Sequence, residues 1–230
     1  MNPSVSVLIR LYNGIEFLHE SLASICQQSY DDWEVLIGVN GHGPDGNDVH
    51  LQANKIVEQN KYKDQIRVIN YPYANGGAEV MNLLAEDAKA PWVAFLDVDD
   101  MWLENKLLKQ IHIRDLYPNL DVIGTYCRYF GNMKGSPQIP VGEITVDDFK
   151  RCNPMINSSI LMRKELINFT NEFYGMDDYD LWCRLVLEGR RFYNLDEVLT
   201  LHRIHGASAY NASKKQDPEA LRAHYFSNKN

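Results

Sequence analysis

Residues 93–100 read Val-Ala-Phe-Leu-Asp-Val-Asp-Asp, an apolar run that ends in three carboxylates within four positions. The apolar run is typical of a strand buried on both faces, as the strands of a parallel sheet are. In open α/β sheets, ligands bind beyond the carboxyl ends of the strands, which is where Asp97, Asp99 and Asp100 fall. Carboxylates this close repel one another unless a cation neutralises them, and hard divalent ions bind carboxylate oxygens. The stretch predicts a metal site, and the alternative is a solvated turn whose aspartates cap the next helix.

Composition and charge narrow the class of protein. The 230 residues can bury one sizeable core, and 45% hydrophobic with 23% charged residues is ordinary globular usage. We therefore expect one domain. The formal net charge of -8 argues against non-specific binding of nucleic acid, because neutralising phosphates requires clustered Lys and Arg. An acidic protein that handles a phosphorylated substrate needs a metal ion to reverse the local field.

The sequence predicts a soluble, cytoplasmic protein. Its four cysteines are widely spaced, show no zinc-binding pattern and are expected to be reduced. We expect no transmembrane segment, because no apolar stretch approaches the ~20 residues that span a bilayer. The residues before the first strand lack the basic and apolar regions of a signal peptide. Peripheral contact with a membrane stays open, because an acceptor could be lipid-linked.

Strand and helix patterns alternate over residues 4–130. Short β-rich apolar runs predict strands, and apolar residues at spacings of three and four predict helices. Such alternation indicates an α/β fold with a doubly wound, mostly parallel sheet. The expected strands are 5–11, 33–39, 66–69, 93–96 and 122–129, and the expected helices are 14–28, 49–58, 78–88 and 103–116.

The second half of the chain is less regular. A loop with Gly and Pro spans residues 131–142 and is long enough to be functional, and a polar tail with room for a last helix spans 211–230. The expected helices are 146–151 and 178–188, and the expected strands are 158–162, 192–193 and 198–202.

Loops at two other strand ends could receive a base or a ribose. Residues 10–14 read Arg-Leu-Tyr-Asn-Gly and residues 40–43 read Asn-Gly-His-Gly, and Gly and Asn let backbone N–H groups approach a ligand closely. The alternative for each loop is a tight strand-to-helix turn. Neither a GxGxxG fingerprint nor a P-loop lysine motif is present, which argues against a dinucleotide dehydrogenase and a P-loop NTPase.

Two later segments carry side chains suited to catalysis. Asp177, Asp178 and Asp180 stand where a helix begins, so one of them could be a general base or could cap the helix and interact with its dipole. The spacing does not decide between these readings. Arg203 and His205 lie two positions apart, so in a strand they would face the same way and suit a phosphate clamp beside a metal ligand. A surface location is the commoner case for a single histidine.

These segments occur in the order found in the family-2 glycosyltransferases of the GT-A fold, and residues 4–210 resemble that family. The motifs are weak individually, but their order on the expected strand ends makes the resemblance specific. They are the opening strand at 5–13, Gln27-Gln28-Ser29-Tyr30 with Trp33-Glu34-Val35, Asn75-Gly76-Gly77 followed by Asn82, the Asp-x-Asp motif at 95–100, the Glu-Asp motif at 177–182, and Arg203-Ile204-His205.

The resemblance implies a nucleotide-diphosphate sugar donor whose diphosphate is held by Mn2+ or Mg2+, and an acceptor hydroxyl on a glycan, a lipid or a protein-linked glycan. In it, Asp99 and His205 would bind the metal, and Asp97 would bind the metal or the ribose. Asp100 would lie near the donor sugar, and Asp178 would deprotonate the acceptor hydroxyl. The other donor contacts that it implies are Arg10, Tyr12, Asn13, Asn40, Asn75, Gly76 and Arg203.

The resemblance also implies a domain organisation. One glycosyltransferase domain would cover residues 1–230, with a nucleotide-sugar-binding half at 1–130, an acceptor and catalytic half at 131–210 and a tail at 211–230. The Gln-x-x-Arg-Trp motif and the membrane helices of the processive polymerases are lacking. We therefore expect transfer of a single hexosyl or deoxyhexosyl unit.

The chain departs from the family pattern in three places. Val39-Asn40-Gly41-His42 stands where the family has Asp-Asp-Gly-Ser, so the acid that commonly reads the base is missing, although the amide of Asn40 can hydrogen-bond a base edge. Val80-Met81-Asn82 replaces Ala-Arg-Asn and removes one basic contact near the phosphates. Asp177 stands where the family has the glutamate of its Glu-Asp motif, and its side chain is one methylene shorter.

Two alternatives compete with glycosyl transfer. A nucleotidyltransferase shares the acidic metal site, but it needs a basic, Gly-rich loop after the first strand, where this chain has only Arg10. A degenerate module could have kept the fold and lost turnover. The retention of Asp97, Asp99, Asp178 and His205 argues against this, since a pure binder does not need a general base.

Overall fold

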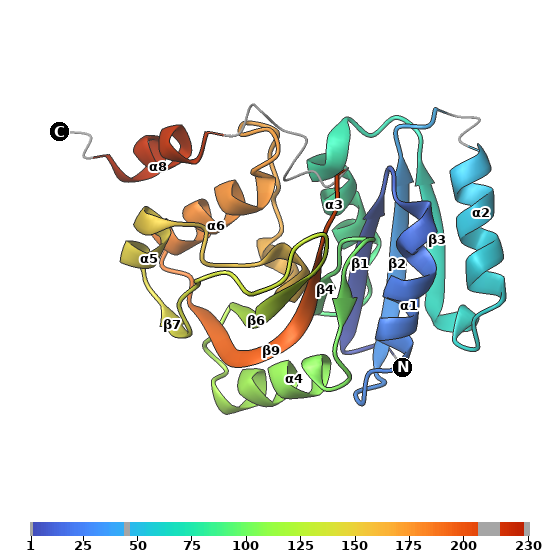
Figure 1. The fold of residues 1–230 in the computed structure, drawn as a ribbon, viewed down its shortest axis with the longest axis horizontal. Helices are drawn as coiled ribbons and strands as arrows, with labels where there is room; N and C mark the ends of the chain where they lie inside the picture. Colours follow the sequence, from blue (N-terminus) through green and yellow to red (C-terminus); the bar gives the residue numbers. More distant parts are fainter. Residues whose placement is uncertain (1, 44–46, 207–216, 228–230) are drawn as a thin grey trace.

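A mixed sheet runs through the protein and carries strands from both halves of the chain (Figure 1). The computed structural model describes residues 2–43, 47–206 and 217–227. Within these residues the sheet has nine strands, in the order β3-β2-β1-β4-β8-β6-β9-β5, with β7 paired to β9. The site predicted from the sequence follows the fourth of them along the chain.

The first four strands are parallel neighbours, as the sequence predicts. β1 (Val5–Leu11) lies between β2 (Trp33–Asn40) and β4 (Trp92–Phe95), and β3 (Ile66–Tyr71) pairs with the far side of β2. Because all four run in the same direction, their carboxyl ends open on one edge of the sheet. Ligand sites of α/β sheets are found at this edge.

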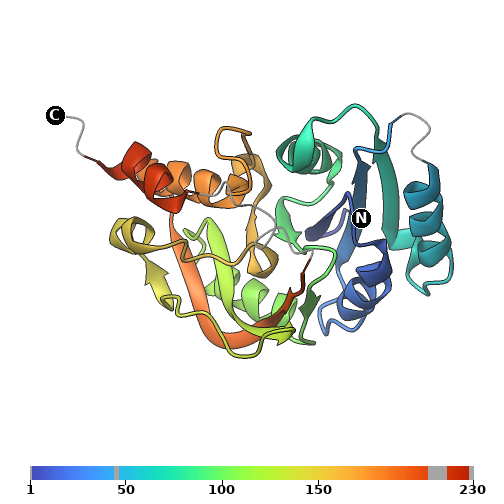
Figure 2. The ribbon, with the colours of Figure 1, turned by 45° about the horizontal axis from the view of Figure 1, so that its top comes forward.

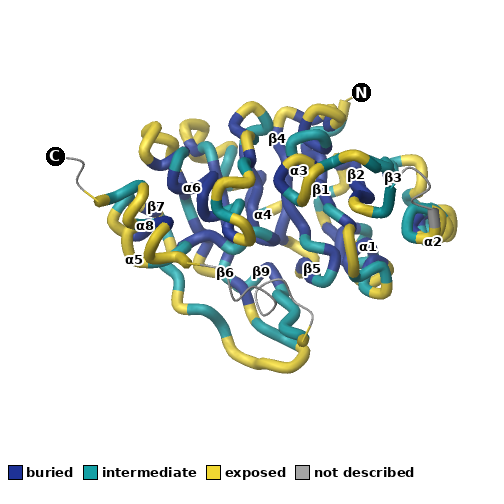
Figure 3. Tube along the Cα trace, turned by 90° about the horizontal axis from the view of Figure 1, so that it is seen from above, coloured by how far each residue is buried: buried dark blue, intermediate teal, exposed yellow. Residues whose placement is uncertain are grey.

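Both faces of β1, β2 and β4 are buried (Figure 3). Leu8 and Leu36 belong to one hydrophobic cluster, while their neighbours Val7 and Ile37 belong to a second, because successive side chains of a strand point to opposite faces. The two clusters divide the helices between them (Figure 2). The first receives α3 (Gly76–Asp87), α5 (Val146–Arg151), α6 (Asp177–Leu187) and α8 (Pro218–Phe226), and the second receives α1 (Leu18–Cys26), α2 (Asn47–Glu58) and α4 (Lys106–Leu116).

The second half of the chain makes the sheet mixed. β8 (Leu161–Arg163) runs antiparallel between β4 and β6 (Val122–Gly131), and β6 pairs in parallel with the long strand β9 (Phe192–Ile204). Two short strands, β5 (Met101–Trp102) and β7 (Gly142–Ile144), run antiparallel to β9. β9 therefore ends beside the turn that follows β4.

Four elements differ from their sequence predictions. The strand expected at 158–162 begins as a 3-10 helix, Asn157–Ser159. The two strands expected at 192–193 and 198–202 form one strand, because a bulge in the pairing with β6 accommodates the exposed residues 196–197. The helix expected from 103 starts at 106, because Met101 and Trp102 pair as β5. The helix expected over 14–28 splits into a 3-10 turn and α1. The remaining 3-10 helices are Ile15–Phe17, Lys63–Gln65 and Lys164–Leu166.

In the described part of the chain, no helix is both long enough and apolar enough to cross a membrane. Helix α8 lies in the tail predicted from the sequence. Residues 211–216 and 228–230 of that tail, and residues 44–46 of the loop predicted after β2, lie outside the described residues.

Candidate active site

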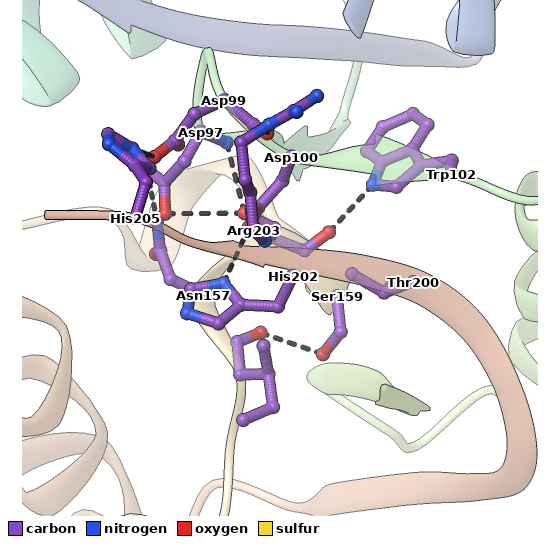
Figure 4. Close-up of polar contacts among 12 residues, drawn as sticks. Asp97, Asp99, Asp100, Trp102, Asn157, Ser159, Thr200, His202, Arg203 and His205 are labelled. Carbon is purple, nitrogen blue, oxygen red and sulfur yellow. Dashed lines mark hydrogen bonds and ion pairs between the residues drawn. The ribbon is translucent and has the colours of Figure 1, made fainter. Parts of the chain in front are cut away.

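The turn after β4 is held from one side by the 3-10 helix that precedes β8. The side chain of Asn157 donates to Asp97 Oδ1 at 3.1 Å, and Ser158 Oγ donates to Asp97 Oδ2 at 3.2 Å (Figure 4). The Asp97 backbone N–H also points to Ser158 Oγ, at 3.0 Å. The Asp97 carboxylate thus has a fixed direction and is 26% exposed, so it can still reach a ligand.

Asp99 meets the end of β9. Its Oδ2 lies 2.9 Å from His205 Nε2, and both side chains are partly exposed, at 22% and 24%. The ring of Phe17 packs against His205, with 5.2 Å between ring centroids. The carboxylate and imidazole that the sequence assigns to a metal are therefore brought together, although they are more than 100 residues apart in the chain.

Asp100, which was predicted to lie near the donor sugar, is fully buried. Its Oδ2 accepts from His202 Nδ1 at 2.8 Å, and its Oδ1 accepts from the backbone N–H of Arg203 at 2.7 Å. Burial lowers the pKa of His202, but the hydrogen bond and the charge of Asp100 outweigh it and raise that pKa to about 9. Asp100 therefore fastens the Asp-Val-Asp-Asp turn to β9.

Arg203, the predicted phosphate clamp, makes several contacts that hold β9 in place. Its guanidinium lies 4.6 Å from the ring centroid of Phe17 and 4.3 Å from that of Phe130. The Nε atom donates to the Asp99 carbonyl at 2.8 Å, and one terminal nitrogen pairs with Glu20. Through these contacts Arg203 joins β9 to α1 and to the turn that follows β4.

Asp178 lies in the first turn of α6. Its Oδ1 accepts from the Tyr179 N–H at 2.7 Å, and its Oδ2 accepts from Asn153 at 3.1 Å. Burial and the adjacent charge of Asp177 raise the pKa of Asp178 to about 7. Asp180, in contrast, is fully buried and packs against the loop before the helix. Its partners are Thr170, Arg184 and Tyr225.

Arg10 connects the two acidic segments. It extends from the end of β1, its Nη1 donates to Asp177 at 2.8 Å, and its Nε lies 3.8 Å from Asp97. The first turn of α6 therefore lies beside the turn that follows β4. The predicted base and the predicted metal ligands border the same site.

The other predicted donor contacts fall on the same edge of the sheet. Tyr12 and Asn13 are exposed at the end of β1, and the Tyr12 ring stacks on His42 with 5.4 Å between centroids. Asn40 ends β2 and is 6% exposed. Asn75 and Gly76 start α3, where Gly76 adopts a left-handed φ of 88° that only glycine takes without strain.

The chemistry of Asp99 and His205 fits a divalent cation. Within the described residues, no group of three or more His, Cys, Asp or Glu side chains is arranged as a metal cluster. Mg2+ and similar ions, however, commonly take one or two protein ligands and complete their shell with substrate phosphates and water. Asp99 and His205 supply one oxygen and one nitrogen donor, which leaves positions for a diphosphate.

Comparison with known proteins decides the family. Residues 6–176 match the family model described as glycosyl transferase family 2. The chain belongs to this family. The prediction of a family-2 glycosyltransferase is thus confirmed, and the alternative of a nucleotidyltransferase is set aside.

The chain is similar in sequence to a named glucosyltransferase and in fold to two solved structures. It is 28% identical over 212 residues to the Escherichia coli protein WfaP, named as a UDP-Glc:alpha-D-GlcNAc-diphosphoundecaprenol beta-1,3-glucosyltransferase, covering 89% of this chain and 78% of WfaP. Its fold matches S. aureus TarS in complex with UDP-GlcNAc, with a TM-score of 0.74, 19% identity and coverage of 93% of this chain and 61% of TarS. It also matches the Pyrobaculum calidifontis mannosyltransferase PcManGT in complex with GDP-Man and Mn2+, with a TM-score of 0.69, 14% identity and coverage of 91% of this chain and 59% of PcManGT. The GT-A fold is therefore confirmed, and this chain spans about three fifths of these two solved chains.

Several residues of the site were not predicted from the sequence. Asn157 and Ser158 orient Asp97, His202 pairs with Asp100, and Asn153 holds Asp178. Asn and Ser are common in loops, so their type gives little signal. The position of His202 did give a signal, because it lies next to Arg203 and three residues before His205, and both of these were already predicted to belong to the site.

Proposed function

We propose that this glycosyltransferase moves one hexose from a nucleotide-diphosphate sugar to a hydroxyl of a lipid-linked glycan, with inversion and with a divalent cation. The observation that supports it best is the bridge formed by Arg10, which contacts Asp177 at 2.8 Å and lies 3.8 Å from Asp97. This bridge sets Asp178, the proposed base, beside the aspartates that would face the donor diphosphate.

Asp178 is the general base of the proposed reaction. With a pKa of about 7, it is ionised in much of the protein at neutral pH and still holds a proton well, which suits this role. The acceptor oxygen attacks the anomeric carbon from the face opposite the nucleotide, and Asp178 takes the hydroxyl proton. The bond from that carbon to the diphosphate oxygen breaks, and its electron pair leaves with the diphosphate. Asp99 and His205 would hold a cation that neutralises the charge developing there.

The relatives guide the choice of substrates. The name of WfaP specifies a UDP-Glc donor and a GlcNAc-diphosphoundecaprenol acceptor, so UDP-glucose and a GlcNAc-diphosphate lipid are the first pair to test. The donor base is left open, because the amide of Asn40 can donate as well as accept a hydrogen bond, whereas a carboxylate only accepts. A lipid-linked acceptor would require peripheral contact with a membrane.

Thermal unfolding with a panel of nucleotide sugars tests the proposal. One donor should raise the Tm in the presence of Mn2+, and raise it less in its absence, because a ligand that binds only the folded protein stabilises it by mass action. ATP with Mn2+ is the control for non-specific binding of a nucleotide. If no nucleotide sugar stabilised the protein with Mn2+, the proposed donor site would be wrong. Stabilisation without transfer to any acceptor would favour a module that only binds.

A further inference from the structure

Arg10 forms an ion pair between segments that are 167 residues apart in the chain. The side chain of Arg10 is 31% exposed and that of Asp177 is 17% exposed, so the pair is partly shielded from water. Partial shielding strengthens such an interaction relative to an ion pair on the surface. The same guanidinium lies 3.8 Å from Asp97, so it neutralises charge on both sides of the site.

Three elements create the space for this guanidinium. β1 supplies Arg10, α6 supplies Asp177, and the first turn of α3 supplies a gap at Gly77. A Cβ atom at Gly77 would lie only 2.6 Å from Arg10 Nη1. A side chain at position 77 would therefore displace the guanidinium from its place beside Asp177.

The charge of Asp177 acts on its neighbour Asp178. Burial and Asp177 raise the pKa of Asp178, while the Tyr179 N–H, the charge of Arg10 and the Asn153 side chain lower it. Within the described residues, the Cys183 thiol on the next turn of α6 and the adjacent Tyr179 hydroxyl are further titratable groups near Asp178. Among these groups, Arg10 is the one positive charge, and it acts both on Asp177, its ion-pair partner, and on Asp178.

We propose, on the basis of the function proposed above, that Arg10 is a positioning residue whose ion pair with Asp177 holds the first turn of α6 at the end of β4 and keeps Asp178 available as a base. Without the guanidinium, Asp177 would be an uncompensated charge adjacent to Asp178. Two neighbouring carboxylates without a counter-charge cannot both ionise easily. Asp178 would then keep its proton at neutral pH.

The protonation of Asp178 can be measured without any substrate. In protein labelled with carbon-13 at the aspartate carboxyls, an NMR titration follows Asp178, whose signal is assigned by its loss in Asp178→Asn. Arg10→Met should raise the midpoint of this titration by about one pH unit, since the charge of Arg10 lowers the pKa of Asp178 and loss of a nearby opposite charge typically shifts a carboxyl by about that much. Asp177→Asn should lower it, and the double variant should return close to the wild-type value. An unchanged midpoint in Arg10→Met would overturn the proposal, whether or not the protein turns over the proposed substrates.

Kinetics then separate positioning from direct donor binding. In Arg10→Met, kcat at pH 7 should fall about fivefold for a one-unit shift from a pKa of about 7. The donor KM should stay within about twofold, and adding Asp177→Asn should restore part of kcat. Arg10→Lys keeps the positive charge, so the titration midpoint of Asp178 should stay at its wild-type value. This variant provides the test if Arg10→Met does not fold. Arg128→Met, at an exposed position of β6, is the matched control. A raised donor KM with an unchanged kcat, and no recovery in the double variant, would instead make Arg10 a donor contact and overturn the positioning role.

Discussion

The Asp178 carboxylate binds a proton more tightly in the folded protein than in an unfolded chain, because burial and Asp177 raise its pKa to about 7. An unperturbed aspartate titrates near ~3.9. Between these two values the folded state holds more protons than the unfolded state, so this group's contribution to the free energy of unfolding falls as the pH rises and is lost above about pH 7. Asp178→Asn should therefore gain about 4 kcal/mol of stability relative to the wild type between about pH 4 and pH 8.

Urea unfolding of both proteins at the two pH values measures this difference. Comparing the two pH values cancels any effect of the lost carboxylate that does not depend on pH. Asp147→Asn is the control, because that side chain is 80% exposed. A stability difference between Asp178→Asn and the wild type that stayed constant with pH would show that Asp178 has an ordinary pKa.

Asp99 is the residue on which metal binding should depend most. At a Mn2+ concentration of about 100 times Kd, binding stabilises a protein by about 2.7 kcal/mol. Asp99→Ala removes one of the two proposed protein ligands, so at the same concentration most of this stabilisation should disappear. Thermal unfolding with and without Mn2+ and a nucleoside diphosphate measures it, with Asp115→Ala in α4 (61% exposed) as the control. Equal stabilisation of Asp99→Ala and the wild type would remove Asp99 from the metal site.

The residues of the turn after β4 could be identified from the sequence, but the role of each one could be predicted only for some of them. Asp99 and His205 are together, as predicted, because a strand end and the turn beside it bring them within 2.9 Å. The burial of Asp100 was not predictable, because a short turn can direct any of its carboxylates inward and no local pattern says which. Arg203 was expected to face a phosphate, yet Phe17, Phe130 and Glu20, which engage it, come from distant parts of the chain.

At the level of elements, the end of β9 depends on Arg203. A flat guanidinium between two phenyl rings cannot be replaced by a lysine ammonium, which does not stack and forms no planar fork. We expect Arg203→Lys to lower the free energy of unfolding by about 2 kcal/mol and to weaken Mn2+ binding as well. Arg128→Lys, on the neighbouring strand and exposed, should change neither.

Thermal unfolding and a Mn2+ titration of the two lysine variants check this. The loss of Mn2+ affinity is expected because β9 carries His205, which contacts Asp99. Wild-type stability and Mn2+ affinity in Arg203→Lys would show that charge alone, without stacking, holds the strand end.

The helices and strands differ in how accurately the sequence predicts them. Long periodic segments such as β2 and α2 were predicted within two residues of their bounds, because hydrophobic burial sets their pattern. β5 and β7 have two and three residues, too few to show a period. β9 looked like two strands, because its bulge brings the exposed Asp196 and Glu197 into the middle of a strand.

For the whole molecule, the sequence predicted the parallel half of the sheet but not the contacts that unite the site. Arg10 with Asp177, Asn157 with Asp97, and His205 with Asp99 each join segments at least 60 residues apart. The order of the motifs along the chain indicated the family, and the family model confirms it. Which side chains meet depends on the antiparallel insertion of β8 and on the length of β9, and both are set by packing of the complete sheet.

A transfer assay tests the proposed reaction itself. It uses the donor that stabilises the protein and a GlcNAc-diphosphate lipid as the acceptor, and NMR determines the anomeric configuration of the product. With Mn2+ and an α-linked donor sugar, the wild type should give a β-linked product. Asp178→Asn should still bind the donor, while its kcat falls at least about a hundredfold, the usual contribution of a general base. An α-linked product, or turnover of Asp178→Asn at the wild-type rate, would contradict inverting transfer with Asp178 as the base.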